Sequence, residues 1–241
     1  MKKEEKDYLS QYWVGLMDGD GSIQVNHWRK KRLQYRLVIK LKNDPGGCNL
    51  LLLEKIQKSV GGSVRVEKNT LWVVWVENHR KKISQMLSVF EKYPPLTKRL
   101  LSQLCFLKEC MKKQCVSWYL VNRDQKYNQP LGRASFDLRE RRGWLSGFIE
   151  AEGCFTLRKS SSKTLSFSIT KKGERELLEG INRHFGGRTR VRGVTTTPSL
   201  SSLYVLEIYT LDVLKNIASH CTLFPLYGEK NRLFLLFSKF L

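Results

Sequence analysis

The sequence lacks the features that would take a chain into or across a membrane. No apolar run approaches the roughly 20 residues that a spanning helix needs. The opening stretch MKKEEKDYLSQYW carries charges of both signs and contains no apolar segment of the kind found in a signal peptide. We therefore expect no membrane partner.

Residues that typically hold zinc are few and scattered. The chain has 6 cysteines and 4 histidines, and the cysteines form no CxxC pair. Structural zinc sites need such residues at short, regular spacing. This pattern argues against a zinc site and predicts reduced, mostly buried thiols inside a cell.

Acidic residues are also scarce relative to basic ones. The 241-residue chain has 22 Asp and Glu against 43 Lys and Arg, a formal net charge of +21. Such an excess favours a polyanionic partner. DNA and RNA are the leading candidates, and an acidic membrane surface is the third. The apolar fraction of 41% is enough for a folded core, so a disordered chain is not expected.

The chain contains one internal duplication. The strings VGLMDGDGS and LSGFIEAEGCF match step by step from Gly15 and Gly147 onward: glycine, two apolar residues, acid, small, acid, glycine, small. Each string is followed, in the same order, by a Gly-Gly pair and an aromatic-proline pair. One repetition indicates a tandem duplication rather than a solenoid, which needs more copies.

The predicted organisation is two similar halves joined by a linker. We assign residues 1–120 to the first half, 121–134 to the linker and 135–241 to the second half. The linker assignment rests on a stretch rich in Asn, Asp, Gln, Pro and Gly. Periodicity predicts a helix over 5–19 that ends at Gly21, then strands, helices and strands in the order αββαββα, with one more helix. The fold class is α+β.

Two predicted antiparallel strand pairs present a polar face that is nearly free of acids. Side chains such as Gln, Asn, Arg and Lys pair with base edges in the major groove, which admits a β-ribbon. The predicted DNA-binding residues of the first half are Ser22, Gln24, Asn26, Trp28, Lys30, Gln34, Arg36, Val38, Lys40, Lys42, Arg65 and Glu67. Those of the second half are Cys154, Thr156, Arg158, Ser166, Ser168, Thr170, Arg188, Arg190 and Arg192. The two faces differ, which suits an asymmetric target.

The repeated motif places small residues four apart on one helix face. Gly15 and Gly19 have this spacing, as do Gly147 and Ala151. Small residues allow two helix backbones to approach closely. If the two motif helices pack through these faces, their C-terminal ends lie side by side.

That arrangement would bring Asp20 next to Glu152. Two adjacent carboxylates repel each other unless a cation lies between them, and oxygen ligands favour Mg²⁺ or a similar hard ion. The main-chain carbonyls of Gly19 and Ala151 are further candidate ligands. Asp18 and Glu150 point to the opposite side of their helices, so we interpret them as structural, hydrogen-bonding groups.

The paired motif resembles that of LAGLIDADG homing endonucleases, in the form in which one chain holds both halves. The resemblance covers nearly the whole chain. It implies saddle-shaped sheets that lie on double-stranded DNA, a pseudo-twofold interface of motif helices, and a functional monomer. It further implies that Asp20 and Glu152 bind Mg²⁺, for which Ca²⁺ or Mn²⁺ substitutes, and that both strands are cut across the minor groove to leave 3′ overhangs. The gene would lie in a mobile intron of a mitochondrial or chloroplast genome.

The family also places basic and polar groups around the metal ions. By resemblance these are Lys98 or Arg99 in the first half and Lys230 in the second. Strict alignment pairs Arg99 with Lys230, which leaves the choice between Lys98 and Arg99 open. A polar residue at the foot of the second strand matches Asn43 in one half and Lys171 in the other.

Two other functions are compatible with the resemblance. One is a maturase that binds intron RNA and assists splicing, a role that some members of the family have. The other is a DNA-binding protein that has lost cleavage, although both motif acids are intact. The presence of Asp in one half and Glu in the other leads us to expect unequal cutting rates for the two DNA strands.

Overall fold

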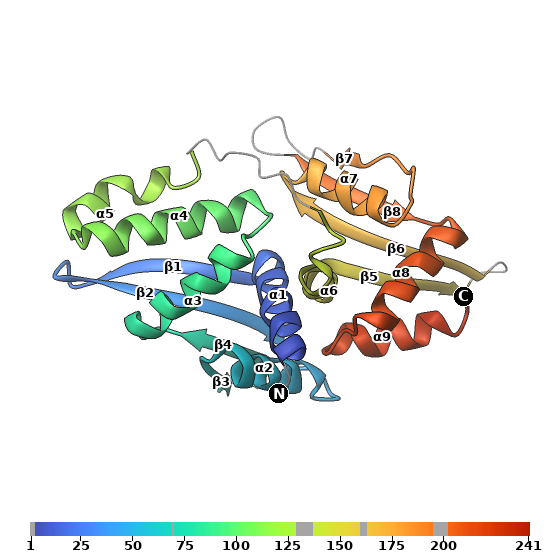
Figure 1. Cartoon of the computed structure of the whole chain (residues 1–241), viewed down its shortest axis with the longest axis horizontal. Coiled ribbons are helices and arrows are strands. Elements are labelled where there is room, and N and C mark those ends of the chain that lie inside the picture. The colour runs from blue at the N-terminus through green and yellow to red at the C-terminus, as the bar shows by residue number, and fades with distance from the viewer. Residues whose placement is uncertain (1–2, 69, 129–136, 160–162, 195–201) are drawn as a thin grey trace.

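A computed structural model describes residues 3–68, 70–128, 137–159, 163–194 and 202–241, except the side chains of 158, 159 and 163. Its secondary structure follows the predicted order twice (Figure 1). The first half contains α1 (Lys3–Gly19), β1 (Gly21–Trp28), β2 (Arg32–Lys42), α2 (Cys48–Val60), β3 (Ser63–Val66), β4 (Trp72–Glu77), α3 (Arg80–Lys92), α4 (Lys98–Lys113), α5 (Val116–Asn122) and η1 (Arg123–Gln125). The second contains α6 (Arg142–Glu152), β5 (Gly153–Lys159), β6 (Lys163–Lys172), α7 (Arg175–His184), β7 (Arg192–Val194), β8 (Leu203–Ile208), α8 (Leu211–Leu223) and α9 (Glu229–Ser238).

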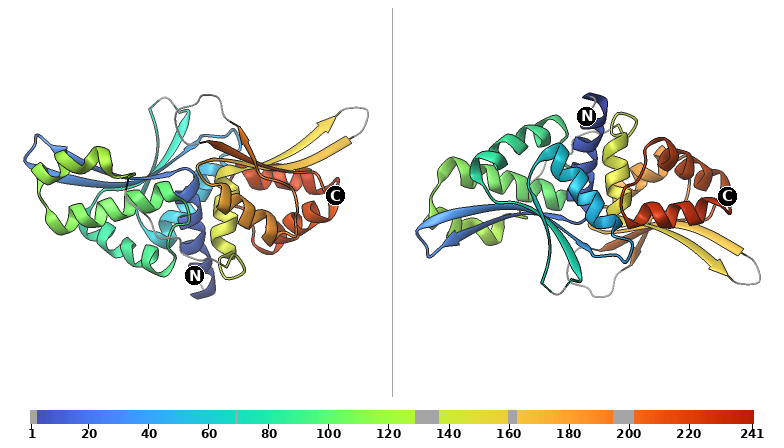
Figure 2. Two further views of the ribbon diagram at one scale, coloured as in Figure 1. Left: turned by 90° about the horizontal axis from the view of Figure 1, so that it is seen from above. Right: turned by 90° about the horizontal axis from the view of Figure 1, so that it is seen from below.

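The described part of each half forms one four-stranded antiparallel sheet, and the strand orders, β1-β2-β4-β3 and β5-β6-β8-β7, are equivalent. The described helices lie on one side of both sheets, and none of them covers the other side (Figure 2). Alternate strand residues such as Leu37, Ile39 and Trp75 face the helices and are fully buried. No helix in the described segments is both long and apolar enough to cross a membrane. The α+β fold of two αββαββα halves is confirmed.

Two details differ from the sequence-based expectations. Helix α1 ends at Gly19, and Gly21 already begins β1. A Cβ at Gly21 would lie only 2.5 Å from the Cα of Met17, so the glycine permits a close turn and does not act as a left-handed helix cap. The predicted linker over 121–134 begins inside helix α5, which the sequence analysis did not predict, and residues 129–134 of this linker are outside the described residues.

The two halves meet where the backbones of α1 and α6 touch. A Cβ added at Gly15 would lie 2.0 Å from the carbonyl oxygen of Trp144, and one added at Gly147 would lie 2.0 Å from the carbonyl oxygen of Tyr12. No side chain fits at that distance, so glycine is required at both positions. The predicted contact through small residues is therefore present in the structure.

Two reciprocal hydrogen bonds cross this interface. The Tyr12 hydroxyl on α1 donates to the Glu150 carboxylate on α6 at 2.9 Å. The Trp144 indole N–H on α6 donates to the Asp18 carboxylate on α1 at 2.7 Å. Tyr12 and Trp144 each lie three residues before the interface glycine, so the two bonds are related by the pseudo-twofold symmetry.

Asp18 and Glu150 also hold the last long helix of each half in place. Asp18 accepts backbone N–H bonds from Leu96 and Thr97, directly before α4, at 2.8 and 3.1 Å. Glu150 accepts bonds from the N–H groups of Gly228 and Lys230 at the start of α9, both at 3.0 Å. The first N–H groups of a helix have no partner within it, and a buried carboxylate satisfies them. The structural role expected for the first acid of each motif is borne out by these contacts.

We expect Gly147→Ala to destabilise the fold strongly. The new methyl group would meet the Tyr12 carbonyl oxygen and force α1 and α6 apart, at a cost of about 3 kcal/mol in the free energy of unfolding. Urea titration monitored by circular dichroism measures this loss. Gly193→Ala is the matched control, because among the described residues its Cβ would meet only the Tyr204 ring, at 3.5 Å. Equal stability of the two variants would contradict the close backbone contact.

We expect Tyr12→Phe to lower the free energy of unfolding by about 1.5–3 kcal/mol, because a buried carboxylate loses a hydrogen-bond donor. Tyr227→Phe is the control. The Tyr227 ring packs beside Tyr12, and within the described residues no hydrogen bond involves its hydroxyl. The control is expected to change stability by no more than about 0.5 kcal/mol. If both variants lose the same stability, the hydrogen bond to Glu150 contributes nothing.

Candidate active site and nucleic-acid interface

Asp20 and Glu152 stand at the adjoining ends of α1 and α6. The helices touch directly before them: a Cβ at Gly19 would lie 2.1 Å from the Ala151 Cβ and 3.3 Å from the Glu152 Cγ. The last turns of both helices therefore lie against each other, at the junction of the two sheets. The structure places the two predicted carboxylates beside each other.

Asp20 has the environment of an unneutralised carboxylate. The protein around it displaces water and, together with the nearby negative charge of Glu152, raises the pKa of Asp20 to about 6. Lys171, Lys230 and Arg99 oppose the shift. Asp20 still exposes part of its surface, and within the described chain its carboxylate has no hydrogen bond or ion pair. It is therefore accessible to a cation from solution.

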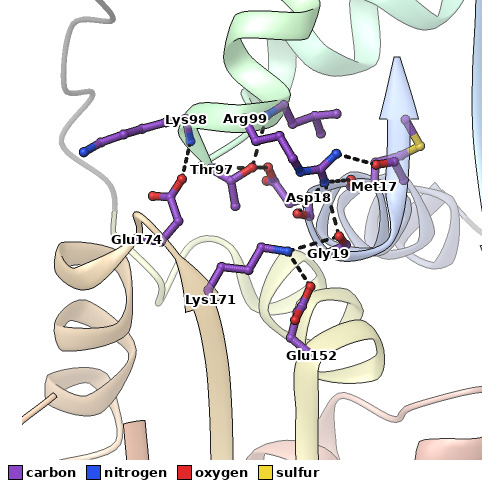
Figure 3. A network of polar contacts seen from close by, with 11 residues as sticks. Met17, Asp18, Gly19, Thr97, Lys98, Arg99, Glu152, Lys171 and Glu174 are labelled. Atoms are coloured by element: carbon purple, nitrogen blue, oxygen red, sulfur yellow. Dashed lines mark hydrogen bonds and ion pairs between the residues drawn. The ribbon is translucent and has the colours of Figure 1, made fainter. Parts of the chain in front are cut away.

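Glu152 differs from Asp20 because it has a cationic partner. The Lys171 ammonium, at the end of β6, contacts the Glu152 carboxylate and donates to the Gly19 carbonyl oxygen at 3.1 Å (Figure 3). Both side chains are largely buried, with exposed fractions of 13% for Lys171 and 19% for Glu152. Lys171 thus links the carboxylate of one half to the helix end of the other.

The Arg99 guanidinium covers the C-terminal end of α1. It donates to the carbonyl oxygen of Gly21 at 2.6 Å. It also donates to the carbonyl oxygens of Asp18 and Gly19 at 2.9 and 3.2 Å (Figure 3). A positive charge at this position offsets the partial negative charge of the helix C-terminus. The Gly19 carbonyl therefore accepts from two cations, so a metal ion at this predicted ligand competes with both.

The structure distinguishes Lys98 from Arg99. Helices α4 and α9 begin at Lys98 and Glu229, so Arg99 is the equivalent of Lys230. The Lys98 side chain points away from Glu152, and its backbone N–H donates to Glu174 at 2.6 Å (Figure 3). Of the two alternatives, only Arg99 has its cation against the motif helix.

The predicted match between Asn43 and Lys171 is wrong in register. The strand pairs begin at Gly21 with Ile39 and at Gly153 with Ile169, so the first-half equivalent of Lys171 is Leu41. Asn43 lies two residues further on, and its side-chain amide donates to the Thr70 carbonyl at 2.8 Å. The pairing of β2 with β1 and of β6 with β5 reveals this offset.

The outer face of the first sheet carries the predicted polar residues together. Ser22 pairs with Val38 and Gln24 with Arg36, and the face continues through β2 to Lys40. The Nε of Arg36 is buried and has no hydrogen-bond partner among the described residues. The remaining predicted residues of this half lie in β1, in β2, in the turn between them, or in and directly after β3: Asn26, Trp28, Lys30, Gln34, Lys42, Arg65 and Glu67.

Strand β4 adds residues that the sequence analysis missed. On its outer side Trp72 is exposed and Val76 partly exposed, while Val74 between them is only 2% exposed; all three pair with alternate residues of β2. The Lys40 ammonium lies 5.0 Å above the Trp72 ring. The sequence predicts a strand here, but not the position of β4 in the centre of the sheet, beside β2.

The outer face of the second sheet is built from different side chains. Cys154 pairs with Ser168 and Thr156 with Ser166, and Ser166 is only 3% exposed. Thr170 is exposed further along β6. The side chain of Arg158 lies outside the described residues. Ser166 is therefore too buried to offer the surface predicted for it.

The arginines predicted for the third strand of the second half lie in two different environments. Only Arg192 lies in β7, where it forms an ion pair with Glu207 at 2.9 Å. Arg188 and Arg190 precede the strand, and both are exposed. All three add positive charge at the edge of the sheet, but the strand is shorter than its alternating sequence suggested.

The comparisons with known proteins agree with this geometry. The family model for the LAGLIDADG endonuclease matches residues 13–110 and 145–241, one match in each half. A probable intron-encoded endonuclease aI3 of Dictyostelium citrinum is 40% identical and covers 99% of this chain and 98% of its own length. One of the same name from Debaryomyces hansenii is 39% identical over 98% of this chain, which spans 38% of that relative's length.

Solved structures show the same fold at low sequence identity. The LAGLIDADG meganuclease I-AabMI bound to uncleaved DNA has a TM-score of 0.73 and 18% identity, with 96% of this chain and 89% of that chain covered. I-SmaMI bound to cleaved DNA has a TM-score of 0.72 and 18% identity, with 95% and 87% covered. With a family match in both halves and relatives of this similarity, the chain belongs to the LAGLIDADG endonuclease family.

Proposed function

We propose that the protein is a site-specific endonuclease that binds double-stranded DNA across its two sheets and hydrolyses phosphodiester bonds at Asp20 and Glu152. The main support is the position of Asp20, which has no partner among the described residues, beside Glu152 and at the junction of two sheet faces that no described helix covers. A duplex lying along both faces would pass over this junction. Because one chain supplies both halves, a monomer contains the complete site.

The site fits a divalent cation with oxygen ligands. The described residues contain no cluster of three or more His, Cys, Asp or Glu side chains, so an ion would depend on the two carboxylates and main-chain oxygens. Asp20, Glu152 and the Ala151 carbonyl would hold it, and such hard donors favour Mg²⁺, with Ca²⁺ or Mn²⁺ as substitutes. When bound, the ion would lower the pKa of a water molecule and neutralise charge that develops on the phosphate.

The protein's own groups have distinct parts in this proposal. Asp20 and Glu152 supply negative charge at the point of cleavage. Arg99 and Lys230, at the second positions of α4 and α9, place positive charge on either side, where a phosphate gains charge in the transition state. Asp18 and Glu150 orient the two helices that carry these cations.

The finer details follow from the family and the two unequal faces. We propose a double-strand break across the minor groove with 3′ overhangs, in a long asymmetric target. The relatives named as intron-encoded endonucleases support an origin in an intron of an organelle genome. Among the neighbours, one I-SmaMI structure is described as bound to uncleaved DNA in the presence of calcium ions.

Cleavage is tested directly by incubating the protein with Mg²⁺ and DNA from its source organism that lacks the intron. One discrete double-strand cut with 3′ overhangs is expected. Binding of that DNA without any cut would favour the non-cleaving DNA-binding alternative. Preferential binding of the intron transcript, again without cleavage of DNA, would favour the maturase.

We expect Asp20→Asn to abolish cleavage while duplex DNA binding is retained. Loss of the carboxylate removes several kcal/mol of metal-dependent stabilisation, so the rate should fall by about a thousandfold or more. Single-turnover cleavage and a gel-shift assay measure the two properties. Asp212→Asn, an exposed acid in the first turn of α8, is the control and should cut normally. Full activity of Asp20→Asn would exclude the proposed metal role.

We expect the affinity for duplex DNA to fall steeply with salt, with a log–log slope of about −0.9 for each phosphate neutralised. Arg65→Ala, on the outer face of the first sheet, should make this slope shallower by about 1. Lys112→Ala, an exposed residue in the last turn of α4, should leave it unchanged. Fluorescence anisotropy across a salt series measures the slopes. A flat salt response would be incompatible with DNA binding on the sheets.

A further inference from the structure

The two motif carboxylates are not equivalent, although the fold around them is pseudo-symmetric. Glu152 has the Lys171 ammonium against it. Asp20 has no such partner among the described residues. One acid therefore has a cation supplied by the protein, and the other does not.

The difference comes from a single position in the strand register. Lys171 and Leu41 occupy equivalent positions in β6 and β2, two residues after Ile169 and Ile39. Both positions face the helices, as the buried isoleucines and Leu41 show. The Lys171 side chain therefore extends toward the helix ends and not toward the outer face. In the first half, the side chain that points in this direction is the apolar Leu41.

The contacts of Lys171 are those expected of a bound cation. Its ammonium bridges the carboxylate of Glu152 on α6 and the carbonyl of Gly19 on α1, two oxygens from opposite halves. The Gly19 carbonyl also accepts from Arg99. A divalent ion brought to these oxygens would meet a positive charge within a few ångströms, at a site that is mostly shielded from water.

We propose that Lys171 is a resident cation that takes the place of a divalent ion between Glu152 and Gly19. The divalent ion is then confined to the other side of the pair, at Asp20 and the Ala151 carbonyl, with the remaining Glu152 oxygen within its reach. This inference rests on the proposed function for its use of metal. It adds that the first half of the site depends on metal, whereas the second half is neutralised by lysine.

Metal binding to the intact protein, without DNA, tests the proposal. The probe is Mn²⁺. The electron paramagnetic resonance signal of the free ion gives the number of Mn²⁺ ions bound per protein molecule and the affinity of the protein for them. The wild type is expected to bind one ion. Lys171→Met removes the ammonium and keeps a side chain of similar length, and it is expected to bind a second ion or to bind Mn²⁺ about tenfold more tightly. Lys171→Gln provides a second uncharged variant if the first folds poorly.

Lys172→Met is the matched control. It makes the same change in net charge one residue further along β6, where the side chain is exposed and points to the opposite face of the strand. It is expected to bind Mn²⁺ as the wild type does. The proposal is overturned if the folded Lys171 variants gain neither an ion nor affinity, or if Lys172→Met gains as much.

The same titration, combined with the cleavage assay, separates this proposal from the proposed function. Asp20→Asn should lose the ion that the wild type binds. If the Lys171 variants gain Mn²⁺ but Asp20→Asn still cleaves DNA, the role of Asp20 in catalysis is wrong and the resident cation stands. If Asp20→Asn abolishes cleavage but the Lys171 variants bind metal like the wild type, the nuclease stands and the resident cation is wrong.

Discussion

Contact between the backbones of α1 and α6 determines where everything else in this protein lies. The helices cross at Gly15 and Gly147, where even a methyl group would collide with the opposite main chain. Because the crossing is this close, the last turns of both helices touch at Gly19 and Ala151. Each helix leads directly into the first strand of its sheet, so the same contact sets the two sheets on either side of the carboxylates.

Each motif contains two carboxylates, and helical geometry gives them different roles by directing them to different sides. The first acid of each motif is directed back into the protein. There it accepts hydrogen bonds from backbone N–H groups at the start of the last long helix of its half and one bond from the opposite motif helix. The second acid comes after the last full turn and faces the space between the sheets. One short segment thereby fixes the arrangement of four helices and presents the reactive groups at the end of two of them.

Pseudo-symmetry governs the scaffold, but the site built on it is asymmetric. Asp20 and Glu152 occupy equivalent positions, yet in the part of the chain that the structure describes Asp20 has no partner and Glu152 contacts Lys171. The Arg99 guanidinium covers the end of α1, whereas the residue equivalent to Arg99 in the second half is Lys230. The outer faces differ as well, with amides and basic groups on one sheet and hydroxyls on the other. A duplicated fold can thus retain its symmetric interface while each half acquires its own chemistry.

The amino-acid sequence by itself determined most of the helices and strands, the duplication, the polar faces and the adjacency of Asp20 and Glu152. These follow from periodicity and from small residues at fixed spacing, which are local properties of the chain. Tertiary structure alone decided that Lys171 corresponds to Leu41 and that Arg99, not Lys98, covers the helix end. Such partnerships depend on strand register and on how separate helices meet, and residues distant in sequence set both.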